Sequence, residues 1–312
     1  MICDDSYKII EKNEDYQCFC IKDDTGYAVL TEYDVFPGVH IIYNDVHMDK
    51  VSVKVPPPST IFEINHCSEG RIECEFNSGE YMYLGRGDLS FNMKAEVNRT
   101  SVFPLGHYHG ITVSFDFSEN HNFFSFIGEE FKLDLKDLRD RICGMREFTV
   151  MRMNQRVEHI FSELYEVPAS IRRGYFKVKV LELLLFLSSI EKTDFQSEKK
   201  YFRRESVEAI KAVERYITSS FDEKITIEQL SEKFQIPLTT MKSCFKEVYG
   251  DSIHAYVKKY RLQKAAELIK NTDMTIGEIA STVGYDNASK FSGAFKTVIG
   301  NTPGDFRKIK RA

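Results

Sequence analysis

The chain has 312 residues, of which 42% are hydrophobic and 29% charged, a balance that excludes a disordered chain and suggests roughly two domains. No apolar run approaches the roughly 20 residues of a membrane helix, no signal peptide is visible, and seven irregularly spaced cysteines indicate reduced thiols, so we expect a cytoplasmic protein without a membrane segment. The net charge of −5 is unevenly spread along the chain. Residues 199–312 hold 21 Lys and Arg against 14 Asp and Glu and so carry a net charge of +7, whereas residues 1–198 carry −12. A basic C-terminal part is typical of a module that binds phosphate groups.

The first 125 residues or so have the pattern of short strands. β-branched and aromatic residues gather in brief segments, and turn residues separate these segments. The predicted strands include Tyr27–Leu30, Val39–Tyr43, Ser59–Ile64, Arg71–Phe76, Tyr81–Leu84 and Gly110–Phe117. Many short strands at close spacing predict a small barrel or sandwich.

Apolar residues take helical spacing after Phe117, and we predict helices over Met151–Val167 and Arg173–Lys192. The second stretch has one apolar stripe and further apolar residues that widen it. The stripe consists of Phe176, Val180, Leu183, Leu184 and Leu187, and the widening residues are Leu181, Leu185 and Phe186. A helix that is apolar over so much of its girth must bury more than one face. Packing on its own barrel and pairing with a second chain both explain the pattern.

The polar stretch from Glu191 to Arg204 predicts a linker, which we place at 193–205. It separates two predicted domains. The first, over 1–192, would sense an effector and form a dimer, with its helical part at about 130–192. The second, over 206–312, is predicted to be all helical.

An internal repeat occupies the C-terminal part. The sequence TIEQLS at 226–231 recurs as TIGEIA at 275–280, and an FK pair followed by glycine at 245–250 recurs at 295–300. The offset grows from 49 to 50 residues, which places one extra residue in the turn of the second copy. Each copy has the pattern of helix, tight turn and helix, over about 227–248 and 276–298, and such a pair places its second helix in the major groove of DNA.

The repeat also predicts which residues face inward. In the first copy these are Leu230, Phe234, Met241, Phe245 and Val248, and in the second Ile276, Ile279, Val283, Phe291, Phe295 and Val298. Pro237 suits the start of a helix, and Gly284 suits the end of one.

The outward faces of the two second helices carry hydroxyls, cations and an amide. These candidate DNA-binding residues are Thr239, Thr240, Lys242, Ser243 and Lys246 in the first copy, and Asn287, Ser289, Lys290, Ser292 and Lys296 in the second. Hydroxyls and cations can bond phosphate, and Asn can contact adenine. A solvated helix face looks similar, but one long helix over Ser252–Ile269 joins the two copies and favours the DNA interpretation. Its roughly 27 Å length approaches the 34 Å or so between successive grooves on one side of DNA.

Four stretches carry a resemblance to a known family: ITIEQLSEKF, FKEVYGDSI, YRLQKAAELI and MTIGEIASTVGYDNASKFSGAFKTVIGNTPGDFRK. With them, residues 212–308 resemble the DNA-binding domain of AraC/XylS transcription regulators. The resemblance implies site-specific DNA binding and, usually, activation of transcription through RNA polymerase. Family members often have arginine where Ser243 and Gly293 stand, so base reading is not carried over to these two positions.

A shorter resemblance links the N-terminal half to the family's cupin-like sensing barrel. Residues 87–89 followed by FPLGHYH at 103–109 resemble a cupin turn and strand, although the first cupin motif is missing. The resemblance implies an effector pocket, and the candidate effector-binding residues are His66, Phe103, His107, Tyr108 and His109. Two interpretations stay open: these side chains line a pocket, or they only pack within the domain.

A metal-binding cupin-type enzyme or sensor is the alternative function. His107 and His109 have the spacing of two ligands on one strand face, and His66 is a third candidate. Metal catalysis needs about three protein ligands and an open position, however, and the matching pattern holds no Glu or Asp. No other catalytic motif is present, so we predict no catalytic residue, no metal site and no cofactor besides an unidentified small-molecule effector.

These observations predict an α+β chain with an N-terminal cupin-like β-barrel, a helical dimerisation segment and a C-terminal all-α domain with two helix-turn-helix units. The predicted function is an effector-responsive transcription regulator, in the first instance an activator. Its predicted partners are double-stranded DNA, RNA polymerase, the effector and a second copy of the chain. Effector binding would shift the population of arrangements of the DNA-binding domains.

Overall fold

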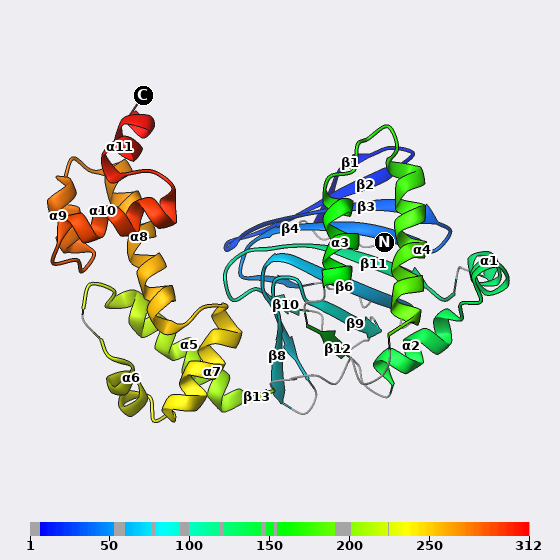
Figure 1. Ribbon diagram of the computed structural model, residues 1–312, viewed down its shortest axis with the longest axis horizontal. Helices are drawn as coiled ribbons and strands as arrows, with labels where there is room; N and C mark the ends of the chain where they lie inside the picture. The colour runs from blue at the N-terminus through cyan, green and yellow to red at the C-terminus, as the bar shows by residue number, and fades with distance from the viewer. Residues whose placement is uncertain are drawn as a thin grey trace. The chain divides into compact units, whose positions relative to one another are not determined.

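The computed structural model describes residues 7–52, 60–76, 79–93, 100–118, 121–144, 148–152, 155–190, 201–223 and 225–311. The chain divides into two compact units, residues 1–201 and 202–312. Figure 1 shows antiparallel sheets with helices in the first unit and helices almost throughout the second, so the α+β class and the all-α C-terminal part are confirmed. None of the helices among these residues is long and apolar enough to cross a membrane.

The larger sheet of the first unit has eight antiparallel strands. In spatial order they are β1 (Tyr7–Lys12), β2 (Tyr16–Asp23), β3 (Gly26–Phe36), β4 (Val39–His47), β11 (Tyr108–Asp116), β6 (Ile61–Gly70), β9 (Leu89–Met93) and β12 (Phe148–Met151). A second sheet contains, in order, β8 (Glu80–Leu84), β7 (Ile72–Glu75), β10 (Thr100–Val102) and β5 (Lys50–Ser52). The described strands form these two sheets and no closed barrel, which differs from the predicted cupin-like barrel.

Four helices follow the last long strand. They are α1 (His121–Phe131), α2 (Leu135–Cys143), α3 (Gln155–Tyr165) and α4 (Arg172–Ser188). The predicted start of a helix at Met151 is wrong, because this residue pairs with Leu89 in the sheet as the end of β12. The Lys192 end of the other predicted helix lies outside the described residues, and α4 ends at Ser188.

The main core lies between the larger sheet and these helices, and α3 and α4 lie across its face in Figure 1. Ile41, Ile64 and Val113 of the sheet share this core with Leu164 and Val180 of the helices. The predicted stripe of α4, from Phe176 to Leu187, is buried as expected. A second core includes Val46, Met82 and Tyr108.

The second unit begins with a two-residue strand, β13 (Phe202–Arg203), and continues as helices. They are α5 (Arg204–Ser219), α6 (Ile227–Lys233), α7 (Leu238–Tyr249), α8 (Ile253–Asn271), α9 (Ile276–Thr282), α10 (Ala288–Ile299) and α11 (Pro303–Arg311). The predicted linker at 193–205 lies partly in residues 191–200, outside the described residues, and α5 begins at Arg204. Within this unit, α8 runs from the group of α5, α6 and α7 to the group of α9, α10 and α11 (Figure 1).

Candidate nucleic-acid interface

The two helix-turn-helix motifs begin in the same way. Thr226 caps α6 by accepting a hydrogen bond from the backbone N–H of Gln229 at 3.2 Å, and the Gln229 side chain accepts the backbone N–H of Thr226 at 2.9 Å. Thr275 and Glu278 make the same reciprocal pair ahead of α9, at 3.2 and 2.7 Å. These capping boxes satisfy N–H groups that a helix start leaves free, and the bonds to Thr275 hold the pKa of Glu278 below its usual value.

The turns inside the motifs also correspond. The first turn spans 234–237 and the second 283–287, so the extra residue predicted in the second turn is confirmed. Gln235 and Gly284 occupy equivalent places and both have left-handed backbone, with φ of 51° and 79°. The left-handed conformation and a lack of space require glycine at 284, because a Cβ there would lie 2.9 Å from the carbonyl oxygen of Asp222.

Arg261 of the long helix α8 ties the loop that precedes the first motif to the turn of the second motif. Its Nε donates to the carbonyl of Phe221, and its two terminal nitrogens donate to the carbonyls of Glu223 at 2.8 Å and Gly284 at 3.4 Å. One guanidinium therefore joins the loop after α5 to the turn of the second motif. The 19 residues of α8 span about 28 Å at roughly 1.5 Å each.

The inward residues of both motifs are largely as predicted. Met241, Phe245 and Val248 of α7 are fully buried, as are Phe291 and Phe295 of α10. The prediction for Val298 is wrong, since this side chain is 39% exposed and Ile299 packs against the core instead. The repeat is imperfect here because α7 packs against α5, α6 and α8, whereas α10 packs against α8, α9 and α11.

The two candidate recognition helices, α7 and α10, present the predicted polar faces. Thr239, Lys242, Lys246, Asn287, Ser289, Lys290 and Lys296 are exposed, and Thr240, Ser243 and Ser292 are half-buried. Neither helix has an acidic residue in its first turn. Each has an exposed lysine in its last turn and is followed by a left-handed glycine. Asn287 has a structural role that the sequence did not suggest, because its side-chain oxygen caps α10.

The candidate effector residues of the first unit do not form one pocket. His66 is buried on the helix-covered face of the larger sheet, stacked on Phe161 with ring centroids 4.4 Å apart, and burial lowers its pKa to about 4. Phe103 and Tyr108 pack in the second core, and Gly110 leaves room for the Tyr108 hydroxyl.

His107 and His109 are half-buried near one end of β11, with ring centroids 6.2 Å apart. Asp45 and His47 of β4 lie against His109, and neither was predicted as a site residue. Their spacing of two along one strand was the available signal.

Two helix-turn-helix motifs joined by one helix define a bipartite DNA-binding domain, and the comparisons with known proteins agree. The family model described as "Helix-turn-helix domain" matches residues 230–309. An uncharacterised HTH-type transcriptional regulator of Escherichia coli, YdiP, is 32% identical over 117 residues, which cover 38% of each chain. A putative AraC-like transcription regulator of Streptomyces lividans is 34% identical over 83 residues, which cover 27% of each chain.

A longer match reaches the transcriptional activator RhaS of Mannheimia succiniciproducens, at 28% identity over 50% of this chain and 57% of that one. Among solved structures, ToxT of Vibrio cholerae aligns over 86% of this chain and 98% of its own, with 15% identity and a TM-score of 0.34. The chain thus spans less than two thirds of each of the three curated relatives described. The C-terminal part of the chain therefore holds a helix-turn-helix domain that is similar to those of AraC-like transcription regulators.

Proposed function

We propose that the whole chain is an effector-responsive transcription regulator that inserts α7 and α10 into successive major grooves on one side of DNA. The observation that carries the proposal is the pair of polar helices α7 and α10, each followed by a left-handed glycine, at the two ends of the long helix α8. The α8 span of about 28 Å approaches the 34 Å or so of one turn of DNA.

The polar groups that we assign to the DNA interface on α7 and α10 divide by chemistry. Lys242, Lys246, Lys290 and Lys296 are suited to phosphates, as are the hydroxyls of Thr239, Thr240, Ser243, Ser289 and Ser292. Asn287 uses its oxygen as a cap, which leaves its NH₂ group for a base or a phosphate. The relative named as an activator supports activation as the output, and we propose contact with RNA polymerase as the route to it. Such a regulator would act on the chromosome, in the cytoplasm.

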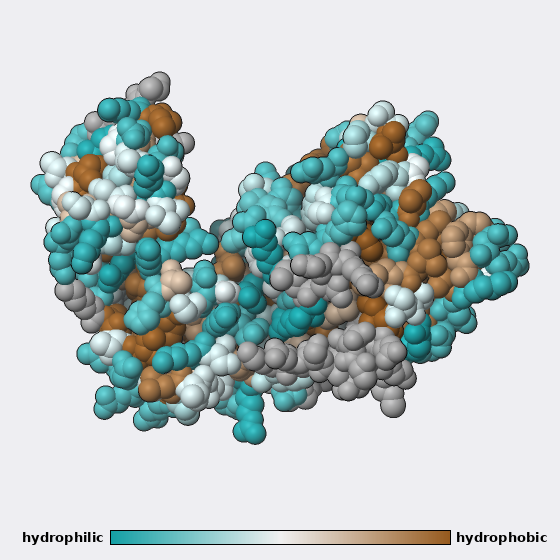
Figure 2. All heavy atoms as spheres, viewed as in Figure 1, coloured by the Kyte–Doolittle hydropathy of each residue, from teal (hydrophilic) through white to brown (hydrophobic). Residues whose placement is uncertain are grey.

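We assign dimer formation to the outer face of α4. Val178, Leu181 and Leu185 follow one another at spacings of three and four residues, which is the pattern of a two-helix seam. Val178 is 60% exposed and Leu185 43%. They line a shallow depression of about 870 Å³, with Phe131, His159, Ile160, Glu182 and Phe186 as its other lining residues. Figure 2 shows apolar residues gathered on this part of the surface, and a second copy of α4 fits it.

We assign effector sensing to the first unit, as a relative of the cupin-like sensing domains. The order of Pro104, Gly106 and His109 before and within β11 supports this assignment. A ligand that changes how two such units pair through α4 would change the spacing of the DNA-binding domains. Regulation then follows from the population of paired arrangements.

The proposed function is tested by titrating the purified full chain against DNA fragments from around its own gene, across a range of salt. We expect one fragment to bind at least about a thousandfold more tightly than random DNA, with an affinity that falls as salt rises. The titration is repeated with pools of metabolites added as a source of the effector. Equal binding to all fragments at every salt concentration, with these pools present, would contradict the proposal.

A further inference from the structure

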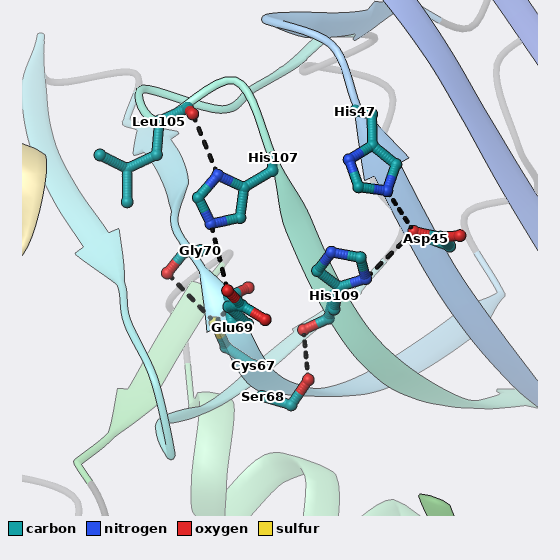
Figure 3. Close-up of polar contacts among 9 residues, drawn as sticks. All are labelled: Asp45, His47, Cys67, Ser68, Glu69, Gly70, Leu105, His107 and His109. Atoms are coloured by element: carbon teal, nitrogen blue, oxygen red, sulfur yellow. Dashed lines mark hydrogen bonds and ion pairs between the residues drawn. The ribbon is translucent and has the colours of Figure 1, made fainter. Parts of the chain in front are cut away.

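Three potential metal-ligating side chains from two neighbouring strands converge at one end of the larger sheet (Figure 3). Asp45 and His47 lie two residues apart on β4, and His109 lies on β11 directly across from Asp45. One nitrogen or oxygen atom from each of the three residues lies within 4.8 Å of the others. The side chains of His47 and His109 are 40% and 30% exposed, so an ion can reach them from solvent.

A β-bulge accompanies the position of His109. The register between β11 and β6 shifts between His109 and Gly110, and Ser68 is the extra residue of β6. The Ser68 hydroxyl donates to the carbonyl of His109 at 2.9 Å, and a Cβ at Gly110 would lie 2.5 Å from the carbonyl of His66. Bulges of this kind re-aim a side chain and are common beside functional sites.

The contacts within the cluster are not those of a hydrogen-bonded group. Asp45 Oδ1 lies 2.9 Å from His47 Nε2 and 3.0 Å from His109 Nδ1. This oxygen is itself buried and has no hydrogen-bond partner among the described residues, although the Asp45 side chain as a whole is 49% exposed. Both imidazole nitrogens are directed at this oxygen (Figure 3), and the three ligand atoms lie close enough together to share one ion.

A second cluster on β3 and β4 gives a useful contrast. Glu32, Asp34 and His40 also lie close together. There, however, His40 Nδ1 makes an ordinary hydrogen bond of 2.8 Å with Asp34 Oδ1, and the Asp34 side chain is 71% exposed. The second cluster is therefore a solvated ion pair and serves as an internal control.

We propose that Asp45, His47 and His109 bind one divalent first-row transition-metal ion, of which Zn²⁺ is the model. Two imidazoles and one carboxylate suit such ions and disfavour Mg²⁺ and Ca²⁺. Bonds of about 2.0–2.2 Å place tetrahedral ligand atoms roughly 3.3 Å apart, close to the two separations already present. His107 lies beside the cluster, with its ring centroid 6.2 Å from that of His109, and its side chain lies 3.7 Å from that of Glu69.

The inference concerns metal binding alone and does not depend on the DNA-binding function. It is tested by calorimetric titration of the reduced, tag-free full chain with Zn²⁺, and by the absorption spectrum of the chain with Co²⁺. We expect one ion per chain at this site and Co²⁺ bands without a sulfur charge-transfer band. His47→Ala, His109→Ala and the near-isosteric Asp45→Asn should each weaken binding by more than the roughly 10–100-fold that loss of an outer-shell partner costs. His40→Ala, the matched control, should bind as the native chain does.

Circular dichroism of each variant shows whether it is folded. If a histidine variant is not folded, the binding comparison is made with Asp45→Asn. Three results would overturn the proposal: no Zn²⁺ binding by the native chain, equal binding by the folded cluster variants, or a thiolate charge-transfer band that assigns the ion to cysteines.

Discussion

The side-chain oxygen of Asn287 accepts a hydrogen bond from the backbone N–H of Lys290 at 2.9 Å. The same asparagine that faces outward at the start of α10 therefore also holds that helix start in shape. Replacement of a capping Asn by Ala costs about 0.5–2 kcal/mol. We expect Asn287→Ala to lower the free energy of unfolding by about this amount, whereas Asn287→Ser should keep most of it. Denaturant titration of the full chain measures both, and equal stabilities would show that the cap is dispensable.

Glycines 284 and 293 should respond in opposite directions to substitution by alanine. Gly284 has left-handed backbone and no room for a Cβ, so Gly284→Ala should destabilise the second motif by more than the roughly 1–2 kcal/mol of the conformation alone. Gly293 lies within α10, and a Cβ there meets nothing within 4 Å. Gly293→Ala should therefore stabilise the chain by up to about 1 kcal/mol. The two midpoints of thermal unfolding should lie on either side of the native value.

Lys246 and Lys296 occupy equivalent exposed positions in the last turns of α7 and α10. If both contact phosphate, alanine at either position should weaken binding to specific and random DNA alike. The slope of log affinity against log salt should become shallower by about 1 for each lost contact. Lys270→Ala, at an exposed position near the end of α8, is the matched control and should leave the slope unchanged. An unaltered slope in both variants would remove these lysines from the interface.

The exposed aliphatic seam on α4 predicts self-association. Val178→Asp or Leu185→Asp would bury an uncompensated charge in a paired seam, and we expect more than tenfold weaker association, which corresponds to about 1.4 kcal/mol. Ile10→Asp changes an equally exposed side chain of β1 (58%) and should have no effect. Sedimentation equilibrium across micromolar concentrations distinguishes these outcomes. A native chain that stays monomeric would contradict the assignment of α4.

His66 should make the stability of the first unit depend on pH. Burial lowers the folded pKa of His66 from 6.5 to about 4, so between these values only the unfolded chain binds the proton. The free energy of unfolding should therefore be highest above about pH 6.5. It should fall as the pH is lowered toward 4, by up to about 3 kcal/mol in all. His66→Gln should flatten the pH dependence in this window relative to the native chain, as denaturant titrations at several pH values would show. Parallel curves would indicate that folding leaves the pKa of His66 unchanged.

The second unit could be predicted closely because its signals are local. The Thr-x-x-Gln and Thr-x-x-Glu pairs, the glycine at 284 and the spacing of Phe291 and Phe295 each specify a cap, a turn or a buried face within a few residues. The prediction that Val298 faces inward was wrong because its environment depends on which helix packs beside α10, and that information is not contained in the repeat.

The first unit could be predicted only in outline, because its site depends on register. Phe103, Tyr108 and His109 are close in sequence, yet the two aromatic residues pack in the second core while His109 lies with Asp45 and His47. The pairing of β4 with β11 and the bulge at Gly110 decide this separation. Neither is visible in a single sequence, so His109 could not be placed with residues that lie 62 and 64 positions before it.

The central claim is that α7 and α10 enter two successive major grooves. It is tested most directly by major-groove methylation interference on the preferred DNA fragment with the full chain. We predict two sensitive segments on one side of the duplex, centred one turn or roughly 10 base pairs apart, with Lys246→Ala weakening one segment and Lys296→Ala the other. A single segment, or two segments on opposite sides, would contradict the account.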